Sequence, residues 1–324
     1  MGRARHGGYA LLLVLGTLAL MAFVIGQLAL RVDELRSQSG ASQAQAEARL
    51  RASQGFSLAL YWVVTQPGGP SGFGMGDARL AADGRPYRLD DGTRVAVQDQ
   101  RGLLSLNWVD DAILGRLLLQ WGATPAQRDT LIDVLKDYTD TDTLRRLNGA
   151  EAADYAERGL MPPANDWLVS VRELARMPVW RESASWVARL DRLASVRRSG
   201  DLNPNVMPLE LLRVSLPLAT PEQITLFDTL RRAGGFADAA SARRATGLIF
   251  PEDTFVFHTS HEISIIVWAP GMSRALEYQV TLAPGGNLPP WLVREVRPVE
   301  IPLGFQDEQR LDPFPPSIRP SARP

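Results

Sequence analysis

The sequence predicts an α+β protein, in which a long apolar N-terminal helix leads into an antiparallel sheet and a large all-helical segment is inserted into that sheet. Three observations predict this class. Residues 9–30 form an uncharged apolar run, alternation typical of strands occurs at 87–97 and again at 263–299, and the block between them has helical periodicity. Strands on both sides of one helical block indicate a single sheet domain that carries an insertion.

The N-terminus combines a basic leader with a segment of membrane length. Residues 9–30 would extend roughly 33 Å as a helix, which matches a hydrocarbon core of about 30 Å. Arg3 and Arg5 precede the run, and the charges that follow it sum to zero: Arg31, Asp33, Glu34 and Arg36. The positive-inside bias therefore predicts that the leader stays in the cytoplasm and that the rest of the chain lies across the membrane.

The apolar run begins directly after Gly7-Gly8, which resembles the leader of type IV prepilin-like proteins. A dedicated peptidase cleaves such leaders after glycine, so the resemblance implies that Gly8 is the last leader residue and Tyr9 the first mature one. A secretory signal peptide has a shorter apolar core and a later cleavage site. The alternative is an uncleaved single-pass anchor.

Composition excludes several kinds of active site. The chain of 324 residues has a net charge of -1, no cysteine and three histidines, His6, His258 and His261. Thiolate catalysis and zinc–thiolate sites are therefore excluded, and the common histidine-dependent hydrolase sites are disfavoured. The near-zero net charge gives no indication of nucleic-acid binding.

The helical signal continues past the membrane segment to about residue 66, where Gln66-Pro67-Gly68-Gly69-Pro70 ends it. Small and apolar residues recur at spacings of three and four along this second half and form one stripe: Ala41, Ala44, Ala48, Ala52, Phe56, Ala59 and Val63. Residues 67–84 are rich in glycine and are expected to be a flexible loop. Asp90-Asp91-Gly92-Thr93 lies between two short strand patterns and predicts a hairpin.

The helical block contains clear start signals. Thr124-Pro125 and Thr220-Pro221 each open a helix, and Ser170 with Glu173 forms a capping box. Strand patterns return at 263–268, 275–281 and 292–299, and the Pro-rich sequence after about Pro302 predicts disorder. The predicted divisions are a leader (1–8), the N-terminal helix (9–66, with 9–30 in the membrane), the first part of the sheet domain (67–108), the helical insertion (109–247), the second part of the sheet domain (248–301) and a disordered tail (302–324).

A series of motifs in the insertion resembles one family. The stretch Asp137-Tyr138-Thr139-Asp140-Thr141-Asp142 is followed by the Asn148-Gly149-Ala150-Glu151 box with Tyr155 nearby. Further along come Asn165, Glu173-Leu174 and Asn203-Pro204-Asn205. This order is similar to that of the K-class minor pseudopilins of the type II secretion system (GspK). The resemblance extends from the leader to about Thr281.

One departure from ordinary pilins agrees with this resemblance. Most pilins and pseudopilins have glutamate at the fifth mature position, which is Leu13 here. In a filament that carboxylate can neutralise the amino group of the subunit ahead, because an unpaired charge in the apolar core is costly. A subunit at the tip has no subunit ahead of it, so Leu13 fits a tip position.

The resemblance implies a pilin-like α/β domain with a large insertion of two SAM-like bundles, and an assembly function without catalysis. It implies a tip complex with the I- and J-class minor pseudopilins above the major G-class pseudopilin. The surfaces expected to contact these subunits are the apolar helix of residues 9–30, the Ala-rich stripe beyond it and faces of the sheet domain. The inner-membrane assembly platform and the prepilin peptidase would be further partners. The expected location is the inner membrane, with the bulk of the chain in the periplasm.

An acidic cluster is the candidate metal site. Asp137, Asp140, Asp142 and Glu151 could supply hard oxygen ligands to Ca²⁺, and calcium sites occur in the family that the chain resembles. The spacing is not that of an EF-hand, because Leu144 and Arg145 stand where a ligand and a glycine are required. The alternative is that these carboxylates cap helices and pair with Arg145 and Arg146.

Other motifs favour structural roles. His258 and His261 match no zinc-binding pattern, and on a strand residues three apart point to opposite faces. Asn203-Pro204-Asn205 is expected to shape a turn and cap the next helix. The arginines after Leu211 leave open a membrane-anchored DNA-binding protein with helix-hairpin-helix-like bundles, although the glycine turn at Gly234-Gly235 is weak. A periplasmic hydrolase is a third alternative, which the small number of histidines and the absence of cysteine disfavour.

Overall fold

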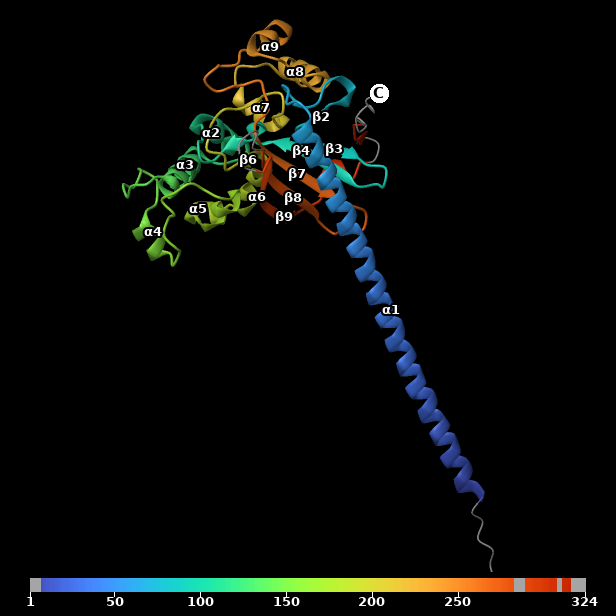
Figure 1. Cartoon of the computed structure of the whole chain (residues 1–324). Helices are drawn as coiled ribbons and strands as arrows, with labels where there is room; N and C mark the ends of the chain where they lie inside the picture. The colour runs from blue at the N-terminus through green and yellow to red at the C-terminus, as the bar shows by residue number, and fades with distance from the viewer. Residues whose placement is uncertain (1–6, 283–288, 308–310, 316–324) are drawn as a thin grey trace, which may run out of the picture.

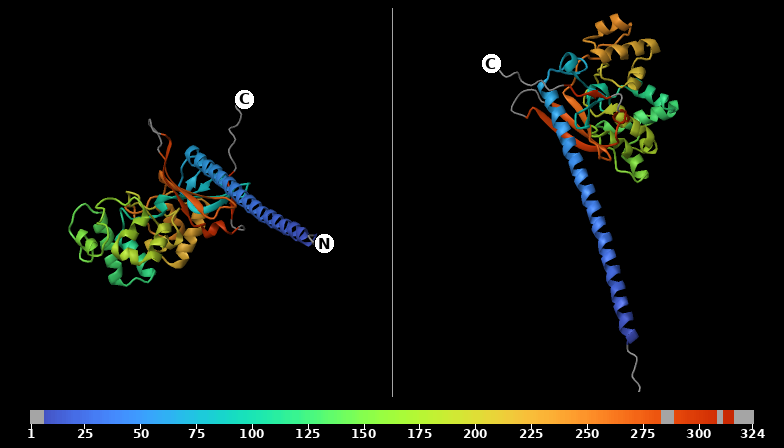
Figure 2. Two further views of the ribbon diagram at one scale, coloured as in Figure 1. Left: turned by 90° about the horizontal axis from the view of Figure 1, so that it is seen from below. Right: turned by 90° about the vertical axis from the view of Figure 1, so that its right-hand side faces the viewer.

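The computed structural model describes residues 7–282, 289–307 and 311–315. One helix, α1 (Gly7–Thr65), extends from a head that contains a sheet and a group of shorter helices (Figure 1). The N-terminal part of α1 stands clear of the head, and its C-terminal part lies along the sheet (Figure 2). The prediction of one continuous helix through the membrane segment is confirmed, with its first turn beginning at Gly7.

The head is built on a six-stranded sheet in the order β10-β3-β4-β7-β8-β9. All neighbours are antiparallel except β10, which is parallel to β3. Its strands are β3 (Asp83–Arg88), β4 (Arg94–Asp99), β7 (Glu262–Trp268), β8 (Ala275–Leu282), β9 (Trp291–Val299) and β10 (Asp312–Pro313). The predicted hairpin is confirmed between β3 and β4, where Gly92 has a φ of +81° that glycine adopts without strain.

The insertion is visible in the strand order. β4 and β7 are direct neighbours, with Arg94 opposite Trp268, although the whole helical block separates them in sequence. The chain therefore leaves the sheet after β4 and returns to the adjacent position. The predicted fold class, an α+β sheet domain interrupted by helices, is confirmed.

The helical part contains eight short α-helices and the 3-10 helix η3 (Val171–Arg176) among the described residues. The α-helices are α2 (Asp111–Gln120), α3 (Pro125–Thr139), α4 (Ala152–Glu157), α5 (Pro178–Glu182), α6 (Ala184–Leu193), α7 (Leu209–Ser215), α8 (Pro221–Ala233) and α9 (Ala239–Thr246). Helices α3 and α8 begin at Thr124-Pro125 and Thr220-Pro221, as predicted, and each threonine forms a capping box. Ser170 also caps as predicted, but the helix that follows is η3. A small parallel pair, β5 (Leu104–Ser105) and β6 (Ala194–Ser195), accompanies them.

Two apolar cores stabilise the head. One fills the helical part and includes Trp180, Tyr155 and Phe227. The other lies between α1 and the sheet and includes Trp62 and Ile265. Each apolar face is thus covered by another element, which is the main favourable contribution to folding.

The Gly-rich segment 67–84 differs from its prediction as a flexible loop. It forms a short antiparallel pair, β1 (Gly72–Phe73) with β2 (Leu80–Ala81), and the 3-10 turn η1 (Gly76–Ala78). Phe73 is buried, and its carbonyl accepts a hydrogen bond from Trp62 Nε1 at 3.1 Å. Gly72 is required because a β-carbon there would collide with the Leu80 carbonyl. The glycines here allow the backbones of β1 and β2 to approach each other closely.

The prediction of a disordered tail from about Pro302 is wrong for residues 302–307 and 311–315. Leu303–Phe305 forms the 3-10 turn η4, with Phe305 buried, and β10 pairs with β3. The Phe314 ring makes edge contacts with Trp62 at 5.9 Å and with Tyr87 at 6.3 Å between centroids. Two aromatic anchors therefore hold an extended Pro-rich segment that has no periodicity of its own. Residues 316–324 lie outside the described residues.

Candidate functional site

The apolar segment of α1 is not covered by any other described part of the protein. Within the described residues, Leu11–Leu28 is the stretch long and apolar enough to span a membrane, with a mean hydropathy of 2.4 and none of it buried by the head. Leu13 lies in this stretch and is exposed. Such a surface is costly in water, and its length and composition are compatible with a single-pass membrane anchor.

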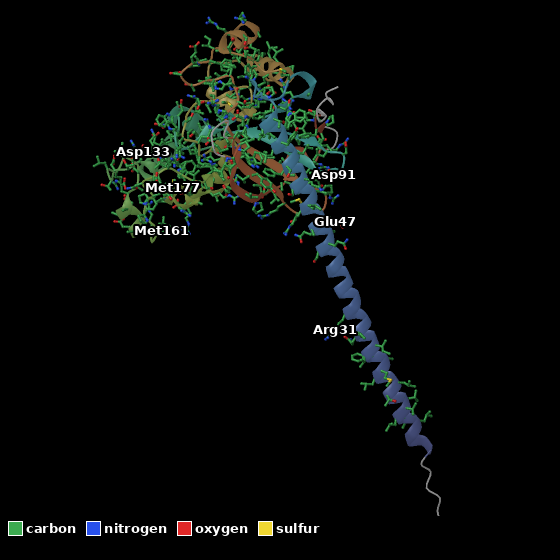
Figure 3. The ribbon with its side chains drawn as sticks, viewed as in Figure 1. Arg31, Glu47, Asp91, Asp133, Met161 and Met177 are labelled. Atoms are coloured by element: carbon green, nitrogen blue, oxygen red, sulfur yellow. The ribbon has the colours of Figure 1, made fainter. Side chains whose placement is uncertain are left out.

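The predicted cleavage point lies at the very start of α1. Gly8 and Tyr9 are in its first turn, whereas residues 1–6 and the side chains of residues 7–10 are outside the described part. Cleavage after Gly8 stays a prediction. In Figure 3, Arg31 lies on the free part of the helix and Glu47 lies where α1 meets the head.

The Ala-rich stripe of α1 packs inside the protein. Ala48, Ala52, Ala59 and Val63 are buried in the core between α1 and the sheet, and Phe56 stacks on Tyr278 of β8 at 3.9 Å between centroids. We expected this stripe to face neighbouring subunits, and that expectation is wrong for these positions. Small residues here allow the helix to lie close to β4 and β7.

The opposite face of α1 is free. Leu50 and Tyr61 are 59% and 57% exposed, and Ser57 between them is also exposed. Spacings of seven and four place these three side chains on one side of a helix. This face continues the line of the membrane segment into the region beside the head, where another helix could lie along it.

The acidic cluster lies on the side of the head remote from α1. Asp133, one turn before Asp137 on α3, is at the far left in Figure 3, well away from Glu47. Asp137 lies in the last turn of α3, Asp140 caps its C-terminus, and Glu151 occupies the N-cap of α4. The loop between the two helices therefore brings three of the four predicted residues to facing helix ends.

Asp137 is fully buried, and Arg146 contacts its carboxylate through both its backbone and its side chain. Its Oδ2 accepts the Arg146 backbone N–H at 3.1 Å, and its Oδ1 lies 3.2 Å from Arg146 Nε. Burial raises the pKa of this carboxyl, the hydrogen bond from Arg146 lowers it, and the charge of Asp140 adds to the rise. The carboxylate also fills the space beside Gly149, where a β-carbon would collide with it.

The loop supplies hydrogen bonds to only some of the carboxylate oxygens of Asp140 and Asp142. Asp140 Oδ2 accepts a hydrogen bond from Arg146 Nη2 at 3.2 Å, but its Oδ1 is buried without a hydrogen-bond partner. Asp142 Oδ1 accepts the Leu144 N–H at 2.8 Å, which is a local turn contact. The alternative of helix capping and arginine pairing thus describes part of the cluster correctly.

Glu151 is the least satisfied member. Glu151 is 8% exposed, and its carboxylate faces backbone N–H groups at the start of α4 without making a well-formed hydrogen bond to them. Burial raises the pKa of Glu151 above its ordinary value of 4.5, and the charges of Asp137, Asp140 and Asp142 raise it further. A buried carboxylate without a partner is expensive, so this position favours a positive ligand.

Asn165 is a member of the cluster that sequence reasoning did not assign. It has a φ of +47°, its Nδ2 donates to the Asp142 carbonyl at 3.1 Å, and its Oδ1 is buried without a hydrogen-bond partner. Its place in the motif order was the available signal. Its left-handed backbone, which points the amide toward the loop, could not be read from sequence.

The cluster is not a preformed metal cage. Among the described residues, no group of three or more His, Asp or Glu side chains is arranged to hold a metal ion. The donor chemistry nevertheless suits a hard cation, since the unpartnered oxygens belong to Asp140, Glu151 and Asn165. Arg146 lies against Asp137 and Asp140.

Asn203-Pro204-Asn205 links the two parts of the head, and does more than shape a turn. Asn203 Nδ2 donates to the Pro70 carbonyl at 2.9 Å. Asn205 exchanges two hydrogen bonds with the Phe236 backbone, at 2.9 Å and 2.8 Å. The next residue, Val206, enters the core between α1 and the sheet, while Met207 lies in the core of the helical part.

The remaining candidates have structural roles. His258 and His261 precede β7, are both exposed, and belong to no metal-binding group among the described residues. Arg231, one of the arginines that suggested DNA binding, is buried and pairs with Asp228 at 2.5 Å. Its Nη1 also donates to the Pro204 and Met207 carbonyls, so this arginine is unavailable to a phosphate.

The family model "Type II secretion system (T2SS), protein K" matches residues 95–199, less than half of the chain. No curated protein matches the sequence. Among solved structures, the GspK-GspI-GspJ complex of the enterotoxigenic Escherichia coli type 2 secretion system is similar, with 14% identity and a TM-score of 0.48. That match covers 84% of this chain and 100% of that one.

The segment matched by the family model runs from β4 through the acidic cluster to the end of α6 and β6. It includes the Asp137–Asp142 stretch and the Asn148–Glu151 box that suggested the same family. Over residues 95–199 the chain is therefore similar to protein K of the type II secretion system.

Proposed function

We propose that this chain is a K-class minor pseudopilin of the type II secretion system, that it occupies the tip of the pseudopilus, and that it initiates or caps its assembly. The observation that carries the proposal is the combination of one continuous helix, bare over its apolar N-terminal part, with a head enlarged by an insertion between β4 and β7. The bare segment packs among the equivalent helices of other subunits. The enlarged head leaves no room for a further subunit above it.

Leu13 supports the tip position. An ordinary subunit needs a carboxylate there to neutralise the amino group of the subunit ahead, whereas an unpaired carboxylate in lipid is costly. A first subunit meets no such amino group, so an apolar side chain is favoured at this position.

The chain is anchored in the inner membrane, with its N-terminus in the cytoplasm and its head in the periplasm. Arg3 and Arg5 before the apolar run support this orientation. The prepilin peptidase cleaves after Gly8 and leaves Tyr9 as the first residue. The role is one of assembly, without catalytic turnover and without nucleic acid.

The I- and J-class minor pseudopilins are the partners in the tip complex, with the major G-class pseudopilin below and the inner-membrane assembly platform as the site of assembly. The free face of α1, marked by Leu50, Ser57 and Tyr61, supports this assignment because it continues directly from the membrane segment. The Ala-rich stripe is already covered by the sheet.

The acidic cluster binds Ca²⁺. Asp140, Glu151 and Asn165 would supply the unpartnered oxygens, with Asp137 and Asp142 as the adjacent carboxylates. The ion would neutralise the cluster and tie the C-terminal end of α3 to the N-terminal end of α4. This contribution is to the stability of the insertion.

Two experiments test the proposal. Mass spectrometry of the chain from cells that contain the processing peptidase should find Tyr9 at the N-terminus, and an intact Met1 would contradict processing. Co-expression with the I- and J-class subunits should give a complex in which each is present once. Recovery of this chain along the length of the filament, in proportion to the major subunit, would contradict the tip position.

A further inference from the structure

The guanidinium of Arg146 lies between two carboxylates of the acidic cluster. Arg146 Nε is 3.2 Å from Asp137 Oδ1, and Arg146 Nη2 is 3.2 Å from Asp140 Oδ2. Asp137 is fully buried, whereas the Arg146 side chain is 42% exposed. The arginine therefore reaches from the surface of the loop to a carboxylate inside the protein.

The same cluster retains oxygens that Arg146 does not satisfy. Asp140 Oδ1 and Asn165 Oδ1 are buried without hydrogen-bond partners, and the buried Glu151 carboxylate makes no well-formed hydrogen bond to the backbone N–H groups that it faces. The neighbouring Arg145 points elsewhere and pairs with Asp154 at 2.9 Å. One guanidinium thus partly neutralises a group of four carboxylates, and the remaining oxygens are available to a second cation.

A divalent ion and the Arg146 guanidinium would compete for the same carboxylates, those of Asp137 and Asp140. Two cations a few ångströms apart repel each other strongly away from bulk water. An ion that uses Asp137 and Asp140 must also displace the Arg146 guanidinium from its ion pairs with these two carboxylates. Because Arg146 is on an exposed loop, its side chain can leave without opening either apolar core.

We propose that Arg146 is an internal counter-cation of the acidic cluster, which holds its carboxylates together in the metal-free chain and is displaced when a divalent cation binds. Arg146 thereby sets the affinity of the site. This inference rests on the calcium binding proposed above. It differs from a permanent ion pair, which would contribute equally to the metal-free and the metal-bound protein.

The test compares the 324-residue chain in detergent with Arg146→Gln, and with Arg145→Gln as the matched control. Calcium affinity is measured by isothermal titration calorimetry, and thermal stability is measured in EDTA and in saturating CaCl₂. Arg146→Gln should bind Ca²⁺ roughly tenfold more tightly, because one repelling charge is removed. It should melt earlier than the unaltered chain in EDTA and at the same temperature in CaCl₂. Arg145→Gln should match the unaltered chain in every measurement.

Arg146→Lys serves if Arg146→Gln does not fold in EDTA. It keeps the charge but loses the two-sided contact, so its calcium affinity should lie between those of the other two chains. Unchanged or weaker calcium binding by Arg146→Gln would overturn the inference, as would an equal loss of melting temperature in EDTA and in CaCl₂. If none of the chains releases or absorbs heat with Ca²⁺, the calcium site itself is refuted. Binding by all chains with one common affinity refutes only the role of Arg146.

Discussion

The Asp137 carboxylate occupies the space beside Gly149, so that a β-carbon on residue 149 would collide with Asp137 Oδ2. This contact links the end of α3 to the box that precedes α4, and it gives a physical reason for glycine between Asn148 and Ala150. The same loop is held against this carboxylate by the backbone N–H of Arg146, which donates a hydrogen bond to Asp137.

Gly149→Ala should therefore destabilise the helical part by about 2 kcal/mol, because the added methyl group forces either the loop or the buried carboxylate to move. Thermal or urea unfolding measures this effect. Gly69→Ala is the matched control, since a β-carbon there meets only an ordinary contact at 3.6 Å. Equal stability of the two variants would show that the contact at Gly149 is not constrained.

Glu151→Gln should make the metal-free chain more stable near neutral pH. The folded-state pKa of Glu151 is raised above 4.5, so the stability of the unaltered chain should fall as pH rises from that value through the raised pKa, and then stay lower. Glutamine removes this loss. It should also reduce or abolish stabilisation by Ca²⁺, because a carboxylate ligand is removed. Melting curves in EDTA from pH 4 to 8 measure the first effect, and Glu157→Gln on the exposed side of α4 is the control. A variant with the same pH profile as the unaltered chain would contradict the assignment.

Phe314→Ala should loosen the C-terminal segment from the sheet. The ring loses its edge contacts with Trp62 and Tyr87, and for a partly buried phenylalanine we expect a cost of about 1–2 kcal/mol. Hydrogen exchange at β3 should accelerate as β10 detaches. Leu303→Ala, at a position that is 83% exposed, should change stability by less than about 0.5 kcal/mol. Unchanged exchange at β3 in Phe314→Ala would show that the segment is held by other contacts.

Asn205→Ala should weaken the junction between the sheet and the helical part. It leaves the N–H and the carbonyl of Phe236 without their buried partner, which costs about 3 kcal/mol for the two groups. Denaturant unfolding provides the measurement. Asn148→Ala removes an exposed asparagine that pairs with Asp133, and it should cost less than about 0.5 kcal/mol. Similar costs for both variants would mean that the Asn205 bonds are not important for the junction.

Tyr61→Glu should reduce recovery of the complex with the I- and J-class subunits by roughly tenfold while leaving the stability of the isolated chain unchanged. Tyr61 lies on the free face of α1, so a charge there repels an apolar partner helix without disturbing the core. Arg49→Glu, an exposed change about a quarter turn from Leu50, is the control for added charge. Co-purification at wild-type yield from Tyr61→Glu would exclude this face from the interface.

Several elements could be predicted from sequence because their signals are local. The apolar run, the Asp-Gly turn at Gly92, and the caps at Thr124 and Thr220 each depend on a few consecutive residues, and the structure confirms them. The insertion was also predictable, since strand patterns on both sides of a helical block leave few other arrangements.

The incorrect predictions concern contacts between distant residues. The Ala-rich stripe has the periodicity of a buried helix face, but periodicity does not say whether the sheet or a neighbouring subunit covers it. The segment after Pro302 lacks periodicity, and only its contacts with β3 and α1 order it. For the acidic cluster, the order of the carboxylates in the sequence predicted that several of them lie close together. The roles of Arg146 and Asn165 followed only from the path of the loop.

By itself the sequence determined that this protein has a membrane-length helix, a sheet with a helical insertion and an acidic stretch, because hydrophobic period, capping residues and turn residues act over a few positions. The tertiary structure alone decided which face of α1 remains free, how Asn205 joins the two cores, and which oxygens near Glu151 lack partners. Those properties depend on side chains that are brought together from distant parts of the chain, and they cannot be predicted from patterns among neighbouring residues.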